Sequence, residues 1–397
     1  MKILFLGYAV NEEEAARLSG ISIAGNKMQV NLLKSLEGHD DIDIECVTVY
    51  PVAPFPNDKS IYISKKSIQI SETLRSIRVG FCNLPLIKQF WQIIMVYLQA
   101  KQMVDKDTVV FTFNMFPQVG IPAKWIKKKY GCFVCSLLAD LPIDDNKESK
   151  NIVRNVLRHC FEKVTCTCIK CADSIIALNP KAVDLFAPGT PFIIIEGGVN
   201  EQDVKPINQE KSNNKRIVYS GALTEYSGIL TLIESMKFIE DKDIKLEIYG
   251  GGYIEDQVKL MAESMPNVFF CGKVSNDKML DIQRNAYLLV NPRPTKDSIA
   301  QVTFPSKMFE YMISGTPVIS TKLNGLSQGF LSRIFVIEDE TPEGFSKTIN
   351  RVCRMSQDDL KAVAESAYSF ILKEKNWTIQ AMKIKSFLED QISGRML

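Results

Sequence analysis

Histidine is scarce in this sequence, with only His39 and His159 among 397 residues. His39 stands between Gly38 and Asp40 at the expected end of a helix, which is a poor position for a catalytic base. The HExxH pattern of zinc proteases is absent, and no Ser–His–Asp arrangement can be recognised. We therefore predict no metal site and no serine-hydrolase chemistry.

An excess of charge of one sign is also lacking. Lys plus Arg number 48 and Asp plus Glu number 46, which leaves a net charge of +2. Proteins that bind nucleic acids usually carry a stronger basic excess, so we expect no nucleic-acid partner. The composition is that of an ordinary globular protein, and the length suggests two domains.

We expect neither a leader peptide nor a membrane-spanning helix in this sequence. Residues Met1 to Gly7 run directly into a strand pattern, without the basic segment and cleavage site of a secretory signal. The apolar stretch Leu84 to Leu98 is interrupted by Pro85 and Lys88, and it is short of the ~20 apolar residues that cross a bilayer. We predict a cytoplasmic protein whose ten cysteines are reduced.

The aromatic residues of this stretch and of the next helical one leave two interpretations open. Trp91 lies among aliphatic residues, and Trp125 lies within a group of lysines, Lys124 and residues 127–129. Such a face can contact a membrane, which would hold the protein peripherally at the inner face of the membrane. The preferred interpretation is a core helix in one case and a solvated helix end in the other.

Short apolar runs alternate with helical patterns along the whole chain. The expected strands are 2–7, 43–50, 108–113, 133–138, 174–178, 192–195, 216–220, 245–249, 268–271, 287–290 and 317–320. This alternation predicts largely parallel sheets with helices on both faces. The polar stretch Glu196 to Ser212 is typical of a linker. We predict an α/β protein with two doubly wound, Rossmann-like domains facing across a cleft, residues 1–200 and 201–376.

The strongest local signal is the segment Phe304 to Ile319. Pro305 is expected as the first helical residue, with Ser306 and Lys307 in the first turn, where free N–H groups favour an anion. A lysine opposes the helix dipole there unless an anion such as a phosphate is bound. Glu310 lies one turn deeper on the same face and can accept hydrogen bonds from a ribose. A capped helix with a surface Lys307–Glu310 pair explains these residues equally well.

Other residues that follow expected strands are weaker candidates. Arg293 follows an apolar run and is positioned to approach Lys307, and two cations around one point suit a diphosphate. The acidic stretch Asp140 to Asp145 follows a strand of the first domain. There, Asp140 can bind an acceptor hydroxyl or act as a base, or the stretch is a solvated loop. Glycines at 25, 221 and 250–252 suit a ligand-side turn, without forming a complete G-x-G-x-x-G fingerprint.

In combination, these motifs resemble a known family. The resemblance rests on four segments: Tyr219–Ile229 (YSGALTEYSGI), Gly250–Gly252, Val290–Arg293 (VNPR) and Pro305–Tyr311 (PSKMFEY). Their order and spacing resemble the retaining glycosyltransferases of family 4 (group 1), which have the GT-B fold. The resemblance covers nearly the whole chain and is sharpest from 216 to 320. It implies a nucleotide-sugar donor as co-substrate on the C-terminal domain, no cofactor and no essential metal, and a last helix, 377–397, that crosses back to the first domain.

The resemblance also implies roles for individual residues. Glu310 would bind the ribose, and the diphosphate would be bound by Lys307, Ser306 and Arg293. The base would be held by Gly272 to Val274. Gly25 and Gly221 would contact the donor through their backbones. Lys307 and Arg293 would act in catalysis by stabilising the leaving diphosphate, with Asp140 on the acceptor side. This sequence departs from the family where the usual first glutamate, eight residues before Glu310, is Val302. That glutamate normally contacts the donor sugar.

The implied reaction is retaining transfer of a hexosyl group to a glycan or lipid-linked acceptor, as in bacterial surface polysaccharide synthesis. Two alternatives share the architecture: a sugar-nucleotide 2-epimerase, which the shortage of histidine disfavours, and a non-catalytic nucleotide-sugar-binding partner. A dinucleotide-dependent oxidoreductase is disfavoured by the missing glycine fingerprint. The sequence does not identify the sugar, the base, the acceptor, the linkage or the oligomeric state.

Overall fold

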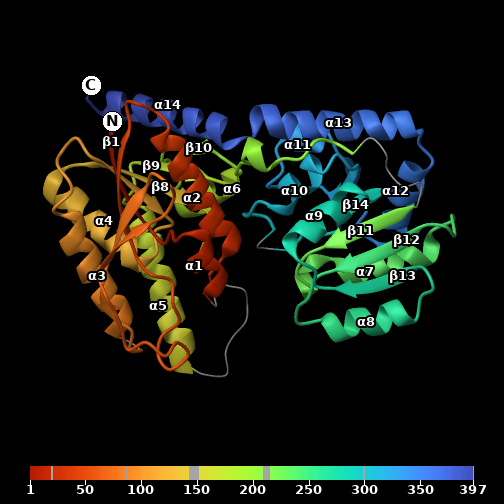
Figure 1. Cartoon of the computed structure of the whole chain (residues 1–397), viewed down its shortest axis with the longest axis horizontal. Helices are drawn as coiled ribbons and strands as arrows, with labels where there is room; N and C mark the ends of the chain where they lie inside the picture. The colour runs from red at the N-terminus through yellow and green to blue at the C-terminus, as the bar shows by residue number, and fades with distance from the viewer. Residues whose placement is uncertain (19–20, 86, 143–151, 209–214, 298–299, 397) are drawn as a thin grey trace. The chain divides into compact units, whose positions relative to one another are not determined.

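The computed structural model describes residues 1–397 except 19–20, 86, 143–151, 209–214, 298–299 and 397. The chain forms two compact units, one of Met1–Gly197 with Trp377–Leu397 and the other of Gly198–Asn376. Each unit has its own sheet (Figure 1). Apolar side chains are buried within each unit. Within the described residues, no helix is long and apolar enough to cross a membrane.

The N-terminal unit is built on an eight-stranded sheet of order β10-β9-β8-β7-β1-β2-β5-β4. Its strands are β1 (Lys2–Gly7), β2 (Asp43–Thr48), β4 (Lys66–Gln69), β5 (Arg75–Arg78), β7 (Val109–Phe113), β8 (Phe133–Leu138), β9 (Ser174–Ala177) and β10 (Phe192–Ile194). The described strand pairs are parallel except β4 with β5. A separate ribbon pairs β3 (Tyr62–Ile63) with β6 (Phe81–Cys82).

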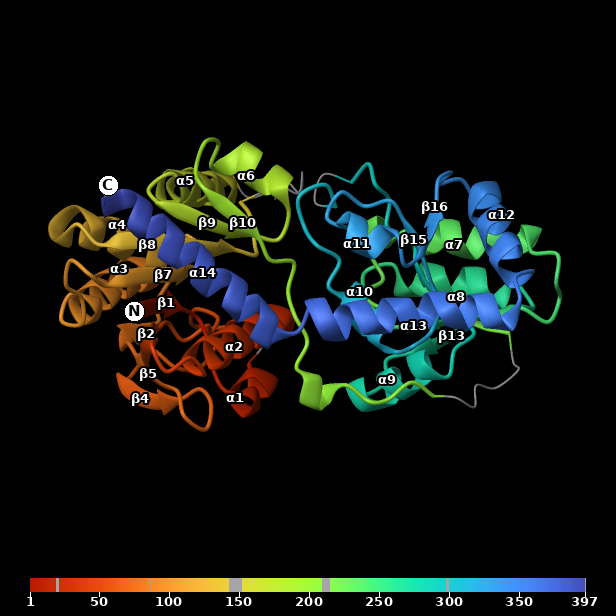
Figure 2. The ribbon, with the colours of Figure 1, turned by 90° about the horizontal axis from the view of Figure 1, so that it is seen from above.

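The side chains of β1 alternate between two apolar cores. Ile3 and Phe5 pack in one core with residues of α2 (Ile23–Glu37) and α14 (Trp377–Met396), two helices that also pack on each other (Figure 2). Leu4 and Leu6 pack in the other with α3 (Ile87–Ala100) and α4 (Pro117–Tyr130). Because successive strand side chains point to opposite faces, the sheet is covered on both sides. The remaining helices of the unit are α1 (Glu12–Arg17), α5 (Ile152–Ile169) and α6 (Pro180–Phe186).

The C-terminal unit has a six-stranded parallel sheet of order β13-β12-β11-β14-β15-β16. Its strands are β11 (Arg216–Ser220), β12 (Lys245–Tyr249), β13 (Val268–Gly272), β14 (Leu288–Asn291), β15 (Val318–Thr321) and β16 (Phe335–Ile337). Its helices are α7 (Ile229–Ser235), α8 (Glu255–Glu263), α9 (Asn276–Arg284), α10 (Lys307–Ile313), α11 (Gln328–Leu331), α12 (Pro342–Cys353) and α13 (Gln357–Glu374). This strand order is that of a Rossmann sheet, which confirms the predicted α/β class.

Several elements differ from the sequence-based expectations. The first long helix begins at Ile23 rather than at residue 26, because the Ser22 hydroxyl accepts from the Gly25 N–H, and the short α1 precedes it. Strands β3 to β6 and β16 were not expected, since β3 and β6 are only two residues long and β4 and β5 are largely polar. The interpretation of Leu84 to Leu98 as a core helix is wrong for one face, because α3 leaves several large apolar side chains exposed.

Candidate functional site

The C-terminal sheet has a switch point between β11 and β14. From β11 the chain continues to β12 and β13 on one side, and it then returns to build β14, β15 and β16 on the other side. In open α/β sheets, ligands bind in the crevice at the carboxyl ends of the two strands at such a point. Gly221 follows β11, Arg293 follows β14, and Lys307 at the start of α10 lies against Gly221. The structure therefore brings the strongest sequence candidates to the expected edge.

Lys307 occupies the space that a side chain on residue 221 would fill. A Cβ atom on Gly221 would lie 1.7 Å from Lys307 Nζ, and the φ angle of Gly221 is +153°. The Lys307 ammonium lies 4.7 Å from the centre of the Tyr219 ring and 3.5 Å from the Tyr219 hydroxyl. Gly221 was expected to let a ligand approach the backbone, but in this structure it makes room for the lysine.

The ammonium of Lys307 is a half-buried cation. Among the described residues, no carboxylate lies within ion-pair distance of it, so the expected surface pair with Glu310 is not formed. Loss of water lowers the pKa of Lys307 to about 8, while the Glu310 carboxylate raises this pKa and the Arg293 guanidinium lowers it. A bound anion would compensate this desolvated charge.

Tyr311 fixes α10 against the end of β11. Its buried hydroxyl accepts from the Ser220 N–H at 3.0 Å and donates to the Ser220 carbonyl at 3.2 Å. Gln283 donates to the Ser220 hydroxyl at 3.1 Å. Burial raises the pKa of Tyr311 to about 12, so the hydroxyl keeps its proton. Tyr219 and Tyr311 lie inside two of the motifs that resemble the family, but no role was predicted for either of them. The sequence signal that could have indicated their positioning role is a tyrosine within an otherwise apolar strand or helix, because its buried hydroxyl needs a hydrogen-bond partner.

Arg293 is already paired in this structure. It donates to Asp297 at 3.2 Å and to Thr303 at 3.4 Å, and the Asp297 side chain is only 7% exposed. The Arg293 carbonyl accepts from the Thr321 hydroxyl at 2.5 Å, and the Thr295 N–H donates to Glu340 at 3.1 Å. The loop after β14 is thus held by Thr321 at the end of β15 and by Glu340 in the segment after β16. To bind a diphosphate, the Arg293 guanidinium must either donate to Asp297 and the diphosphate together or give up its contact with Asp297.

The start of α10 differs from the sequence-based expectation. The helix begins at Lys307, with Ser306 as its N-cap, so Pro305 precedes the helix instead of being its first residue. Ser306 and Glu310 are both exposed, and the Ser306 hydroxyl makes no capping hydrogen bond. Val302, at the position of the usual first glutamate, is buried. Its side chain can make no hydrogen bond to a sugar hydroxyl.

The glycine turn after β12 packs directly on the turn after β11. A Cβ atom on Gly250 would lie 1.8 Å from the carbonyl oxygen of Gly221, and the φ angle of Gly250 is +138°. The Gly250 N–H donates to the carbonyl of Gly272 at 2.9 Å. Gly272 is the last residue of β13, and the half-buried Val274 lies two residues after it. The loop predicted to hold the base therefore lies at the same edge of the sheet as Lys307.

In the N-terminal unit, Asn114 holds the turn that carries Asp140. Asn114 is buried, has a φ angle of +58°, and accepts from the backbone N–H groups of Ala139 and Asp140 at 2.8 and 3.0 Å. Its amide donates to the Asp140 carboxylate at 3.2 Å. The surrounding chain removes water from that carboxylate and raises the pKa of Asp140. Asp144 and Asp145 lie outside the described residues, and Gly25 lies in the first turn of α2.

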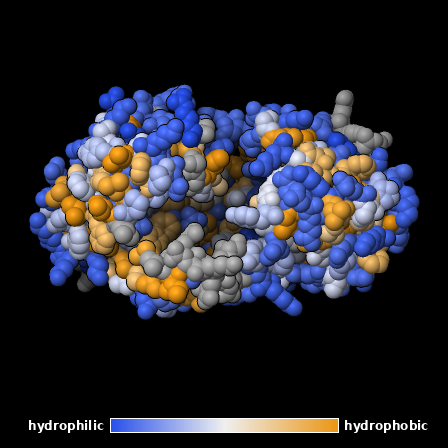
Figure 3. Space-filling view, turned by 90° about the horizontal axis from the view of Figure 1, so that it is seen from below, coloured by the Kyte–Doolittle hydropathy of each residue, from blue (hydrophilic) through white to orange (hydrophobic). Residues whose placement is uncertain are grey.

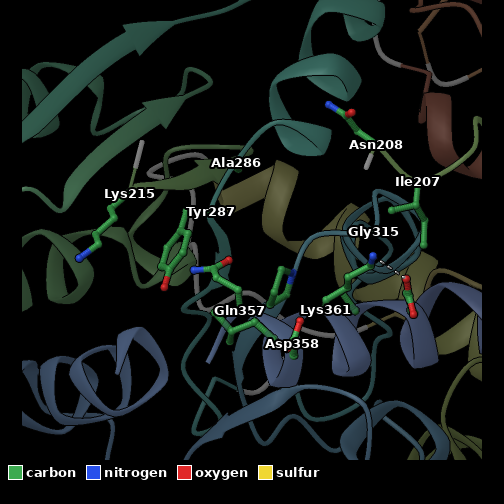
Figure 4. A pocket seen from close by; sticks show the side chains of 13 residues that line it. Ile207, Asn208, Lys215, Ala286, Tyr287, Gly315, Gln357, Asp358 and Lys361 are labelled. Atoms are coloured by element: carbon green, nitrogen blue, oxygen red, sulfur yellow. Dashed lines mark ion pairs between the residues drawn. The ribbon is translucent and has the colours of Figure 1, made fainter. Parts of the chain in front are cut away.

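A cavity of about 420 Å³ in the C-terminal unit lies at the other edge of the sheet (Figure 4). Lys215, Tyr287 and Pro317, which line it, precede β11, β14 and β15, so the cavity is at the amino ends of the strands. It shares no residue with the candidate site. Ligands of such sheets bind at the carboxyl ends, so we do not assign the site to this cavity. Among the described residues, no three His, Cys, Asp or Glu side chains form a metal-binding group.

Comparison with known proteins gives the family of the C-terminal unit. Residues 214–355 match the family model described as glycosyl transferases group 1. The C-terminal unit is a group 1 glycosyltransferase domain. This glycosyltransferase domain contains Gly221, Arg293, Lys307 and Glu310. The protein is thus a glycosyltransferase, as the sequence resemblance implied.

Solved structures resemble the whole glycosyltransferase chain. Sucrose-phosphate synthase from Thermosynechococcus elongatus aligns with a TM-score of 0.70 at 16% identity, over 99% of this chain and 100% of that one. Anabaena HepE in complex with UDP aligns with a TM-score of 0.64 at 14% identity, over 98% of this chain and 100% of that one. The lipopolysaccharide outer core galactosyltransferase WaaB aligns with a TM-score of 0.67 at 16% identity, over 98% of this chain and 100% of that one. These likenesses establish the fold, GT-B with two Rossmann-like domains, as expected. No curated protein matches the chain in sequence.

Proposed function

We propose that this glycosyltransferase transfers a sugar from a nucleotide-sugar donor to a glycan or lipid-linked acceptor with retention of configuration, in bacterial surface polysaccharide synthesis. The observation that carries the proposal is Lys307, a desolvated cation at the switch point of the group 1 domain. A diphosphate is the group that this position suits best, since it supplies the missing negative charge. The structure of the similar protein HepE holds UDP, which is consistent with such a donor.

In the proposed reaction, the bond between the sugar C1 and the diphosphate oxygen breaks, and the acceptor oxygen bonds to C1 on the same face. The leaving diphosphate takes the acceptor proton, so no protein nucleophile is needed. Lys307 and Arg293 stabilise the negative charge that develops on the leaving group, which is the largest expected contribution to catalysis. No metal is assigned to this step, because the two cations supply the compensating charge.

The other candidates take binding roles in this proposal. Glu310 is exposed one turn below Lys307 and accepts from the ribose hydroxyls, and Ser306 donates to the diphosphate. Gly272 and Val274 hold the base through their backbones. Gly25 and Asp140 belong to the N-terminal unit, where Asp140 accepts a hydrogen bond from the acceptor hydroxyl. We also propose that a lipid-linked acceptor brings the protein to the inner face of the membrane.

A thermal-shift screen without added metal tests the donor site. One class among UDP-, GDP- and dTDP-sugars is expected to stabilise the wild type by ~2.7 kcal/mol when present at 100 times its Kd. For a domain of this size that corresponds to a rise in Tm of roughly 5–10 °C. Glu310→Ala should lose most of the shift. If no donor stabilises the protein, the site assignment fails.

Product analysis separates the proposed reaction from its two alternatives. A retained anomeric configuration in the product, read by NMR, supports the transferase mechanism. Interconversion of two nucleotide sugars without an acceptor would indicate an epimerase. Binding without either transfer or donor hydrolysis would indicate a non-catalytic partner.

Donor affinity should fall as the pH rises through about 8. The pKa of Lys307 in the ligand-free protein is about 8, so above this pH diphosphate binding must take up a proton. Kd should then rise by up to ~10-fold per pH unit, and it should stay constant below the pKa. Because this pKa is lower than in the unfolded chain, the same group makes the free energy of unfolding increase between about pH 8 and about pH 10.5.

Titration calorimetry with the nucleoside diphosphate at several pH values measures this dependence. Lys307→Arg is the matched control, since a guanidinium stays charged over the whole range and should flatten the profile. A wild-type Kd that does not change between about pH 7 and about pH 9.5 would contradict the role of Lys307.

A further inference from the structure

Helix α3 exposes a row of large apolar side chains. Its members recur every three or four residues and so lie on one side of the helix: Ile87, Phe90, Trp91, Ile94 and Leu98, here called the α3 face. Phe90 is 71% exposed. The opposite side of α3, with Ile93 and Val96, is buried in the core of the N-terminal unit. Figure 3 shows apolar side chains gathered on the surface of this unit, at the left of the view.

Neighbouring elements extend the α3 face. Trp125 of α4 is exposed, and its ring meets the Tyr97 ring of α3 edge-on at 5.4 Å between centres. The loop after β2 exposes Ile61, and β3 exposes Tyr62. The side chain of Asn83 ties this loop to the start of α3, because it donates to the carbonyls of Ala53 and Ser60 at 3.0 and 2.9 Å. The exposed apolar area is therefore wider than a single helix face.

Acidic residues are missing from this part of the chain. There is no Asp or Glu between Glu72 and Asp105, and none between Asp107 and Asp140, so α3 and α4 contain no carboxylate side chain. Helix α4 carries four lysines, of which Lys127 is paired with Asp173 at 2.8 Å. The other three are exposed: Lys124, Lys128 and Lys129. Asp58, in the loop after β2, acts on the charge of Lys88, but α3 and α4 themselves present apolar, aromatic and cationic side chains, which complement an anionic lipid surface. A second copy of the chain would place lysines against lysines.

The first turn of α3 lies at the edge of the sheet where Asp140 lies. Helix α3 ends at Ala100, shortly before β7 begins at Val109, so its last turn is near the amino ends of the strands and its first turn near the carboxyl ends. Lys88, in that first turn, donates to the carbonyl of Val52, just beyond the end of β2. Asp140 follows β8 by two residues, also at the carboxyl ends.

We propose that the α3 face, with Lys124, Lys128 and Lys129 of α4, docks the protein on an anionic lipid bilayer. The inference rests on the proposed function, since it supplies the surface by which a lipid-linked acceptor would be met. Aromatic side chains such as Trp91 and Trp125 suit the level of the lipid headgroups, and the lysines are attracted to their phosphates. Of this surface, the first turn of α3 lies at the edge that carries Asp140, so an acceptor head group would reach Asp140 from that end, whereas the lysines of α4 lie near the amino ends of the strands.

Co-sedimentation with lipid vesicles tests the docking surface. The full chain should bind vesicles of phosphatidylcholine with phosphatidylglycerol, and Phe90→Glu/Ile94→Glu should bind them at least ~10-fold more weakly, because two apolar side chains no longer enter the interface. Both positions are exposed, so the fold should be unchanged. Leu260→Glu on α8 is the matched control: Leu260 is 69% exposed in the other unit, and this variant should bind as the wild type does.

The lysines are tested separately. Lys124→Glu/Lys128→Glu should lose the preference for vesicles that contain phosphatidylglycerol and the weakening of binding by salt. Lys127 is left unchanged, because its ion pair with Asp173 belongs to the fold. Equal binding of wild type to vesicles with and without phosphatidylglycerol would overturn the anionic specificity.

The outcomes distinguish this inference from the proposed function. If the wild type does not bind the vesicles, or if Phe90→Glu/Ile94→Glu binds as the wild type does, the docking surface is wrong. If that variant only converts a dimer to a monomer in sedimentation, the α3 face is a contact between copies and the inference is also wrong. The thermal shift by the nucleotide should be the same in wild type and variant. If that shift is absent in both, the donor site fails while the vesicle result stands.

Discussion

Replacing Lys307 by alanine will lower kcat/KM for sugar transfer by roughly 100- to 1,000-fold, the usual effect of removing a charged group that stabilises a leaving group. The ammonium lies where no described carboxylate pairs with it, so its charge is available to a diphosphate. The same variant should lose the thermal shift produced by the nucleotide. Steady-state kinetics and the shift assay together measure both effects.

Protein stability provides the internal control for this variant. Removal of a desolvated cation should leave the free energy of unfolding at pH 7 unchanged or higher, so a loss of activity cannot be attributed to unfolding. Lys237→Ala is the matched substitution, since Lys237 is an exposed lysine of the same unit. If Lys307→Ala keeps kcat/KM within a few-fold of Lys237→Ala, the phosphate-binding role of Lys307 is wrong.

Replacing Gly250 by alanine will destabilise the C-terminal unit by about 3 kcal/mol or more, through backbone strain and overpacking together. The new Cβ would lie 1.8 Å from the backbone oxygen of Gly221, which cannot rotate away as a side chain can. At Gly221 itself the clash would be with Lys307 Nζ, the flexible end of a side chain. Alanine at 221 should carry backbone strain as well, since φ is +153° there, and by displacing Lys307 it should also weaken donor binding.

Thermal unfolding measures the Gly250 effect, which should lower Tm by roughly 6–12 °C. Gly272→Ala is the control within the same unit, because Gly272 also has a positive φ of +71° but its Cβ would have no neighbour closer than 4.0 Å. Backbone strain alone should cost about 1–2 kcal/mol there. Equal losses at the two positions would show that the packing between the two turns contributes nothing.

The fold could be predicted because buried parallel strands leave a strong pattern. Continuous apolar runs such as Lys2–Gly7 and Phe133–Leu138 are buried on both faces of their sheet, and they appear in the sequence without interruption. Strand β4 is the edge strand of this sheet, with three of its four side chains exposed, and β5 lies between β4 and β2. Edge strands carry charged residues and resemble loops, which is why they were missed.

The candidate site was only partly predictable, because its decisive feature is a long-range contact. The sequence places Gly221 and Lys307 86 positions apart. That the lysine fills the space beside this glycine depends on the anchoring of Tyr311 to Ser220, which no local pattern encodes. The pairing of Arg293 with Asp297 is local, but a loop arginine of this kind has several partners within reach, and only the structure selects one.

The position of α14 has a consequence for how the protein is made. Trp377, Ala381, Ile384 and Leu388 are buried in the same core as Phe5, yet 179 residues of the other unit separate them from Gly197 in the chain. At roughly 5–20 residues per second, a ribosome needs about 10–35 s to synthesise that intervening unit. During this time the part of that sheet face that α14 covers, beside α2, stays exposed until the last helix is made, and a chaperone would shield it.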